Sequence, residues 1–228
     1  MEKENPLIKL ENVWKIYSLG KVKVEALRGL NINIGKGEFV AVMGPSGSGK
    51  STCVHLIGCL DRPSRGRIYL DGKDINKFTR SQLSSIRGKK IGFVFQQFNL
   101  MNTLTVLENV MLPMMFYEVS LPKRKKRAKE ILDDMGLSHR LKHYPTEISG
   151  GEKQRVAVAR SLANKPTIIV ADEPTGNLDS KRGKEIMEIL DNLHKNGKTI
   201  VLVTHDKLLA NYAERVIYIK DGMNVDAL

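Results

Sequence analysis

The stretch "GPSGSGKST" combines glycines, a lysine and two hydroxyl side chains in the pattern of a phosphate-binding loop. Gly44, Gly49, Lys50 and Ser51 fill the fixed positions of G-x-x-x-x-G-K-[ST]. Glycines let successive backbone N–H groups point at phosphate oxygens, and the helix expected to follow directs its positive end there. The lysine faces the β- and γ-phosphates, and the serine hydroxyl is a ligand for Mg²⁺. The predicted triphosphate site comprises Gly44, Pro45, Ser46, Gly47, Ser48, Gly49, Lys50, Ser51 and Thr52.

Two adjacent carboxylates, Asp172 and Glu173, end the apolar run "TIIVADEP". Ligand sites in open α/β sheets are built at the carboxyl ends of buried parallel strands. We expect Asp172 to hold Mg²⁺, directly or through water. Glu173 can then accept a proton from the attacking water, which favours hydrolysis over binding alone. A nucleoside kinase or a GTPase shares the phosphate loop, so these residues leave the class of enzyme open.

A second cluster of small residues, in "ISGGE", begins a strongly helical segment. Ser149, Gly150 and Gly151 expose backbone N–H groups at that helix start and form a second candidate anion site. An ordinary helix that begins at glycine is the alternative. One nucleotide cannot easily use both anion sites in the same subunit. The economical solution is a symmetric dimer, in which each nucleotide lies between one subunit's phosphate loop and its partner's serine-glycine helix start.

With these motifs in this order, the chain resembles the nucleotide-binding subunit of an ABC (ATP-binding cassette) transporter over almost its whole length. The resemblance implies ATP as the nucleotide and Mg²⁺ as the metal. The family signature LSGGQ appears as "ISGGE", in which Ile148 replaces leucine and Glu152 replaces glutamine at a nucleotide-facing position. Gly176 stands in the D-loop where many members have serine.

The resemblance assigns roles to residues outside these motifs. Gln96 in "FVFQQFNL" becomes a ligand of Mg²⁺ and a sensor of the attacking water, with Gln97 as the alternative. His205 in "VLVTHD" becomes the switch histidine that contacts the γ-phosphate. Tyr17 in "VWKIY" becomes the aromatic residue that stacks on adenine, although Trp14 lies nearby. Asp179 ends the D-loop "GNLD" and joins the nucleotide-binding set.

Two kinds of strand are expected to position these motifs. Alternation of apolar and polar residues predicts half-exposed strands, with Asp71-Gly72 as a hairpin turn, at 7–17, 21–27, 30–34 and 66–72. Continuous apolar runs predict strands buried in a parallel sheet at 38–43, 91–95, 167–172 and 199–205. Helical patterns lie at about 50–60, 150–163 and 180–195. The expected fold is α/β: a P-loop NTPase ABC cassette with a RecA-like parallel-sheet core, an N-terminal antiparallel β subdomain and a helical signature subdomain.

The segment 98–148 has no convincing strand and indicates helices. Thr105 and Glu108 form a capping box before "VLENVML", and a second helix is expected at 123–136. We predict one ABC ATPase domain over 1–228, with a helical subdomain at about 98–163 inserted in the α/β core.

Proline is expected to end the first of these helices. Pro113 should stop it at residue 112 and leave "MMF" on a connection. Methionine suits a surface that repacks against a moving partner. We therefore expect part of an apolar cluster to line a groove for a cytoplasmic helix of a membrane partner, with ordinary helix packing as the alternative. The cluster comprises Phe98, Leu100, Met101, Met111, Met114, Met115 and Phe116.

The distribution of apolar residues along the sequence indicates where the protein is located. No apolar run approaches the roughly 20 residues that span a bilayer. The first ten residues contain no apolar signal-peptide region. We expect a cytosolic protein in which Cys53 and Cys59 are buried, reduced thiols. Much of the net charge of +12 is concentrated in 122–129, which is either a solvated helix face or a contact for phosphate groups of lipid or nucleic acid.

Three classes of ABC protein are compatible with the motifs. A DNA-repair ATPase carries long coiled-coil heptads and a translation factor carries two cassettes, whereas this sequence has neither. The resemblance thus implies a transporter subunit: an ATP-dependent homodimer on the cytoplasmic face of the membrane, with an integral membrane permease as partner. Cargo contact and nucleic-acid binding are not expected. The alternative is a soluble ABC ATPase that acts on nucleic acid or ribosomes.

Two longer stretches narrow the transporter class. "IGFVFQQFNLMNTLTVLENVMLP" and "ADEPTGNLDS" resemble the ATPases of the lipoprotein-releasing and macrolide-export group. Because the sequence ends with "VIYIKDGMNVDAL", we do not expect the extra regulatory domain found in many sugar importers.

Overall fold

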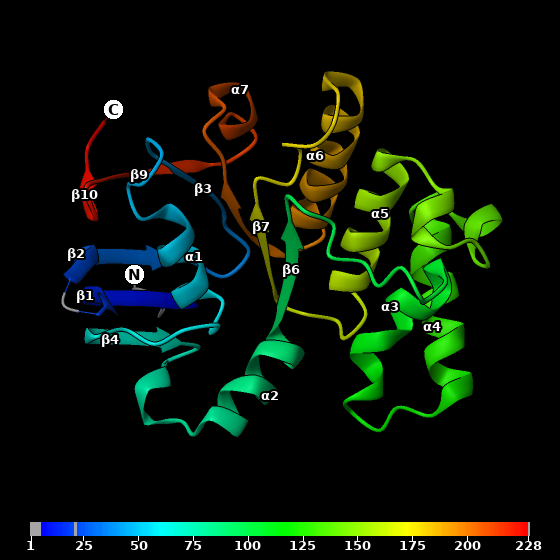
Figure 1. Ribbon diagram of the computed structural model, residues 1–228, viewed down its shortest axis with the longest axis horizontal. Helices are drawn as coiled ribbons and strands as arrows, with labels where there is room; N and C mark the ends of the chain where they lie inside the picture. The colour runs from blue at the N-terminus through cyan, green and yellow to red at the C-terminus, as the bar shows by residue number, and fades with distance from the viewer. Residues whose placement is uncertain (1–5, 21, 228) are drawn as a thin grey trace. The chain divides into compact units, whose positions relative to one another are not determined.

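The computed structural model describes residues 6–20 and 22–227. Lys21, where one predicted strand begins, lies outside the described residues. The chain divides into two compact units (Figure 1), which we call the first unit (residues 1–87 and 193–228) and the second unit (residues 88–192).

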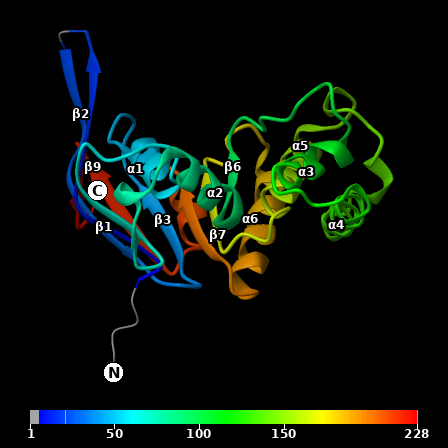
Figure 2. The same ribbon diagram turned by 90° about the horizontal axis from the view of Figure 1, so that it is seen from below.

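An antiparallel sheet forms one layer of the first unit. Its strands, in the order β2-β1-β4-β5, are β1 (Ile8–Leu19), β2 (Val22–Ile34), β4 (Arg65–Leu70) and β5 (Lys73–Asp74). The predicted strands at 21–27 and 30–34 belong to the single strand β2, which pairs with β1 as a long two-stranded arm (Figure 2). Asp71 and Gly72 join β4 to β5 with φ values of 54° and 72°. The predicted hairpin turn is therefore confirmed.

A mixed sheet forms the other layer of the first unit. It contains β3 (Phe39–Met43), β8 (Thr199–Val203), β9 (Arg215–Lys220) and β10 (Met223–Val225). β3 pairs in parallel with both β8 and β9, and β10 pairs antiparallel to β9. Every residue of β3 and β8 is buried, which explains their continuous apolar sequences. The last two strands were not predicted.

Short helices complete the first unit. They are α1 (Lys50–Ile57), η1 (Ile75–Lys77) and α7 (Lys207–Ala210), while α2 (Arg80–Lys90) ends in the second unit. Cys53 and Cys59 are buried and free, as predicted. Burial raises the pKa of Cys53 to about 12, so its thiol stays protonated at neutral pH.

The second unit combines a parallel strand pair with helices. β6 (Ile91–Phe95) pairs with β7 (Ile168–Asp172), in a register that places Phe95 opposite Asp172. The helical elements are α3 (Val106–Met115), α4 (Leu121–Asp134), η2 (Ser138–Arg140), η3 (Pro145–Glu147) and α5 (Gly150–Ser161). The long helix α6 (Ser180–Lys195) follows β7. Figure 1 shows α3, α4 and α5 side by side.

Helix α4 carries the basic run on its exposed side. Ala128, Ile131 and Leu132 are buried, while the exposed lysines are Lys123, Lys125, Lys126 and Lys129. The predicted amphipathic helix is therefore confirmed. Most of the basic residues lie in the N-terminal half of α4, where the positive end of the helix dipole disfavours cations.

The prediction that Pro113 ends its helix is wrong. α3 begins at the predicted Thr105–Glu108 capping box and continues through Pro113 to Met115. Pro113 lies in the last turn, where its missing N–H removes one backbone bond, and its carbonyl accepts a hydrogen bond from Asn164 Nδ2 at 3.2 Å. The "MMF" stretch is consequently not a connection that exposes all three residues. Met114 is buried at 3% exposure, whereas Met115 and Phe116 are 53% and 77% exposed.

Candidate functional site

The phosphate loop has the strand–loop–helix context that its motif requires. β3 ends at Met43 and α1 begins at Lys50, with the glycine-rich loop between them. Gly49 caps α1 with a φ of 103°, a left-handed conformation that favours glycine. A Cβ atom at Gly44 would lie 2.1 Å from the carbonyl oxygen of Ile219. Because glycine has no Cβ atom, the phosphate loop can lie this close to neighbouring backbone.

Lys50 lies beneath the loop and is 8% exposed. Its Nζ donates hydrogen bonds to the carbonyl oxygens of Gly44 and Pro45, both at 2.8 Å. An ammonium group has three donors, so one remains for a phosphate oxygen. The ammonium group is therefore fixed on the inner side of the loop, where the motif predicts the β- and γ-phosphates.

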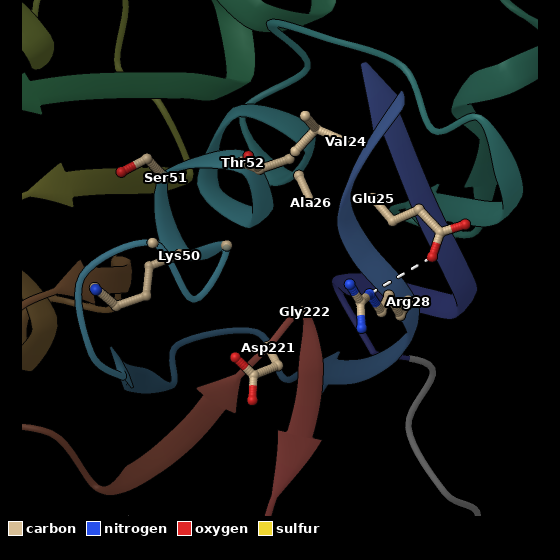
Figure 3. A pocket seen from close by; sticks show the side chains of 11 residues that line it. Val24, Glu25, Ala26, Arg28, Lys50, Ser51, Thr52, Asp221 and Gly222 are labelled. Carbon is tan, nitrogen blue, oxygen red and sulfur yellow. Dashed lines mark ion pairs between the residues drawn. The ribbon is translucent and has the colours of Figure 1, made fainter. Parts of the chain in front are cut away.

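A cavity of about 440 Å³ adjoins the phosphate loop within the first unit (Figure 3). Its volume falls in the range of small-molecule and cofactor sites. Glu25 and Arg28 pair at 3.6 Å on its wall. The cavity is lined by Val24, Glu25, Ala26, Arg28, Gly47, Gly49, Lys50, Ser51, Thr52, Asp221 and Gly222. The sequence did not predict that residues of β2 and of the β9–β10 turn line this cavity. Alternation in "RVIYIK" was the available signal for β9.

Tyr17 lies on β1, next to the strand β2 whose Val24 lines this cavity. In the β1–β2 register Tyr17 is opposite Val24, and opposed residues of antiparallel strands place their side chains on the same face. The Tyr17 hydroxyl donates to Asp61 Oδ2 at 3.3 Å. Trp14 Nε1 instead donates to Asn12 Oδ1 at 3.2 Å. This arrangement supports Tyr17 over Trp14 as the stacking residue.

His205 leaves the sheet at the edge where the phosphate loop begins. β3 and β8 run parallel with Val42 opposite Val203. The loop and His205 therefore follow the same carboxyl edge, within the first unit. The next residue, Asp206, caps α7 by accepting from the Leu208 N–H at 2.8 Å. This cap fixes the backbone on the C-terminal side of His205.

In the second unit, the two candidate catalytic segments also leave one sheet edge. Because Phe95 is opposite Asp172, Gln96 and Glu173 follow adjacent strand ends. Glu173 has a φ of 44°, a conformation that costs free energy for a residue with a side chain. Strained backbone of this kind clusters at functional sites.

Buried Gln154 of α5 joins these strand ends. Its Nε2 donates to the carbonyl oxygen of Phe95 at 3.2 Å and to that of Pro174 at 2.6 Å. These carbonyls directly precede Gln96 and directly follow Glu173. This role could not be predicted from the sequence, because a glutamine within a helix is usually exposed.

The D-loop contacts Gln96 as well. Asn177 Nδ2 donates to the Gln96 carbonyl oxygen at 2.9 Å. A Cβ atom at Gly176 would lie 2.7 Å from Gln96 Nε2. Glycine, which stands here in place of the serine of many family members, therefore leaves room for the Gln96 side chain. This contact supports Gln96 rather than Gln97 as the sensor. Asp179 caps α6 by accepting from the Arg182 N–H at 3.0 Å, a bond that lowers the pKa of Asp179.

The signature residues form a capping box at the start of α5. Ser149 Oγ accepts from the Glu152 N–H at 3.3 Å, and the Glu152 carboxylate accepts from the Ser149 N–H at 2.8 Å. The next backbone N–H groups, of Gly150 and Gly151, have no partner within the helix. Burial opposes ionisation of Glu152, but hydrogen bonds from Ser149 and Arg140 prevail and lower its pKa to about 2. Glu152 is therefore a carboxylate at neutral pH.

The candidate residues thus fall into two groups, one in each unit. The first unit holds Tyr17, residues 44–52 and His205, and the second holds Gln96, residues 149–152, Asp172, Glu173 and Asp179. Within residues 6–20 and 22–227, no group of three or more His, Cys, Asp or Glu side chains could hold a metal ion. Mg²⁺ does not require such a cage, because it is commonly bound by one or two carboxylates together with substrate phosphates. Among the same residues, no helix is both long and apolar enough to cross a membrane.

Residues 27–176 match the ABC transporter family. The chain belongs to this family. It is 51% identical over 216 residues to an uncharacterized ABC transporter ATP-binding protein of Thermotoga maritima, covering 95% of this chain and 92% of that protein. It is 50% identical to a macrolide export ATP-binding/permease protein of Campylobacter fetus, covering 95% of this chain but 34% of that protein.

A solved structure shows the same fold. The dimeric cassette MJ0796 of Methanocaldococcus jannaschii, in a post-hydrolysis state bound to ADP and Pi, has a TM-score of 0.88 and 51% identity. The match covers 95% of this chain and 96% of that chain. The predicted fold class, family and resemblance to the macrolide-export group are confirmed, and the chain is an ABC transporter ATPase cassette.

Proposed function

We propose that two copies of this cassette bind two MgATP molecules between them and hydrolyse ATP to drive a membrane permease. The observation that carries the proposal is that one chain has two separate helix starts with the small residues and free N–H groups that suit phosphate: α1 after the phosphate loop and α5 after Ser149. Each belongs to a different unit of the chain. The dimeric MJ0796 structure, bound to ADP and Pi, supports pairing of cassettes around nucleotide.

The residues of this chain fit MgATP. Lys50 and the N–H groups of residues 44 and 46–52 bind the β- and γ-phosphates, beside a cavity of about 440 Å³; Pro45 has no N–H group. Tyr17 stacks on adenine near the Val24 wall of that cavity. Ser51, Gln96 and Asp172 supply oxygen ligands, the donor type that Mg²⁺ prefers. When bound, Mg²⁺ neutralises charge on the β- and γ-phosphates.

Hydrolysis requires a base and a contact to the γ-phosphate. Glu173 accepts the proton of the attacking water, and its fixed backbone at the end of β7 orients the carboxylate. His205 contacts the γ-phosphate from the edge shared with the phosphate loop. Ser149, Gly150 and Gly151 of the partner copy complete the site, and Asp179 contributes from the D-loop.

The proposed partner is an integral membrane permease. The macrolide export relative carries ATP-binding and permease functions in one protein, of which this chain matches 34%. We therefore place the cassette on the cytoplasmic face of the membrane, where it powers export or release of lipoprotein or peptide without contacting cargo. Nucleic acid is not a proposed partner, since no feature of the described residues besides the basic run on α4 favours it.

Mixing two inactive variants tests the composite site. Lys50→Ala removes the phosphate-facing charge, and Ser149→Arg blocks the helix start of α5. Each variant alone should lack ATPase activity, whereas a mixed dimer retains one site with Lys50 from one copy and Ser149 from the other. Recovery of activity on mixing supports the proposal. If both variants fold and the mixture stays inactive, the composite site is refuted.

A further inference from the structure

The signature helix carries a negative charge that its capping geometry does not require. Glutamine completes the same capping box as glutamate, because either side chain accepts a hydrogen bond from the N-cap N–H. Glu152 instead places a carboxylate at the helix start to which the proposed function assigns the phosphates of a nucleotide. Like charges in close proximity repel, so this site needs a compensating cation.

Arg140 provides that cation. Its Nε lies 2.8 Å from Glu152 Oε1, and the side chains of the two residues are 32% and 12% exposed. The other end of the guanidinium is held by His143, whose Nε2 lies 3.2 Å from Arg140 Nη1. His139 Nε2 is also near Glu152, at 3.8 Å, but this side chain is 62% exposed and charged only when protonated. Arg140 is thus the permanent positive partner of Glu152.

The backbone around Arg140 is fixed to the start of α3. Carbonyl oxygens of Leu141 and His143 accept hydrogen bonds from the N–H groups of Leu107 and Val106, at 3.1 Å and 2.8 Å. These N–H groups lie in the first turn of α3 and have no partner within the helix. The segment after η2 therefore holds Arg140 in place, rather than leaving it as a mobile surface cation.

We propose that Arg140 is a positioning residue for the signature helix. It neutralises Glu152 and keeps the carboxylate on the Ser149 N–H, so that the start of α5 remains attractive to the phosphate groups of a nucleotide held by a second copy. This inference rests on the proposed function, because it assumes that the signature binds nucleotide across a dimer. Arg140 itself does not contact the reacting atoms.

A double-mutant cycle with Arg140→Ala and Glu152→Gln tests this role. In the Glu173→Gln background, the measurement is the ATP concentration at which half of the protein is dimeric. Arg140→Ala should raise this concentration by about ten-fold while Glu152 is charged. The same substitution in the E152Q background should have little effect, because no uncompensated carboxylate remains. A purely structural role predicts an equal loss in both backgrounds.

Controls separate this inference from the proposed function. Arg155→Ala is a matched control, because it also removes one positive charge from the protein. Arg155 lies on α5 and pairs with Glu185 at 3.1 Å, and its substitution should shift the midpoint of dimerisation little. ATP binding by the monomer should be unchanged in Arg140→Ala. If the Glu173→Gln protein fails to dimerise with ATP, the proposed function is wrong. If it dimerises but Arg140→Ala shifts the midpoint equally in the Glu152 and E152Q backgrounds, or not at all, only the role of Arg140 is wrong.

Discussion

At the scale of single residues, Gln154 holds two candidate catalytic segments at the points where they leave their strands. Its side chain is buried and holds the carbonyl groups next to Gln96 and Glu173. Because Glu173 has a left-handed backbone, its position depends on neighbouring bonds that outweigh the strain. Gln154 supplies such a bond through the Pro174 carbonyl.

Gln154→Leu should therefore impair chemistry more than nucleotide binding. The change preserves the approximate volume but leaves two carbonyl groups without their donor, which costs roughly 1–3 kcal/mol for each unpaired buried group. We expect a lower free energy of unfolding in urea, and a lower kcat with a smaller change in KM. An unchanged kcat in a destabilised protein would limit Gln154 to a role in folding.

At the scale of elements, α3 separates buried from exposed methionines. Met114 is 3% exposed and packs in the second unit, while Met115 is 53% exposed. The expectation was that part of the apolar cluster lines a partner groove, and the burial of Met114 assigns this residue to ordinary helix packing instead. The exposed apolar residues Met101, Met115 and Phe116 remain candidates for contact with the permease.

Paired substitutions in α3 test this division. Met114→Glu buries a charge and should lower the free energy of unfolding by several kcal/mol, as measured in urea. Met115→Glu should leave the unfolding midpoint nearly unchanged and preserve the ATPase activity of the isolated cassette. Co-purification with the permease should then weaken in Met115→Glu. Retention of the permease at wild-type levels would assign Met115 to ordinary surface.

The sequence predicted those elements whose signal is local. β3 and β8 are entirely buried, so a continuous apolar run reveals them. Pro113 misled the prediction, because a proline in the last turn removes a single helical bond and need not end the helix. The role of Gln154 could not be predicted, since it bonds Phe95 from 59 residues away in the sequence. Arg140 was missed because only the fold brings it to Glu152.

At the scale of the whole molecule, the proposed function requires a second copy of the chain. The phosphate loop and the signature helix lie in different compact units of one chain, and each is proposed to bind phosphate through N–H groups at a helix start. A nucleotide bound between two copies would contact the phosphate loop of one copy and the signature helix of the other. ATP should then act as the link between subunits, and its hydrolysis should release them.

The measurement that tests this claim most directly is the molar mass of the Glu173→Gln protein with and without MgATP. The amide cannot accept a proton from water, so ATP should persist in the site. Size-exclusion chromatography with light scattering should show a monomer of about 25.6 kDa without nucleotide and a particle of twice that mass with MgATP. A monomer in both conditions, in protein shown to bind ATP, would contradict the composite site.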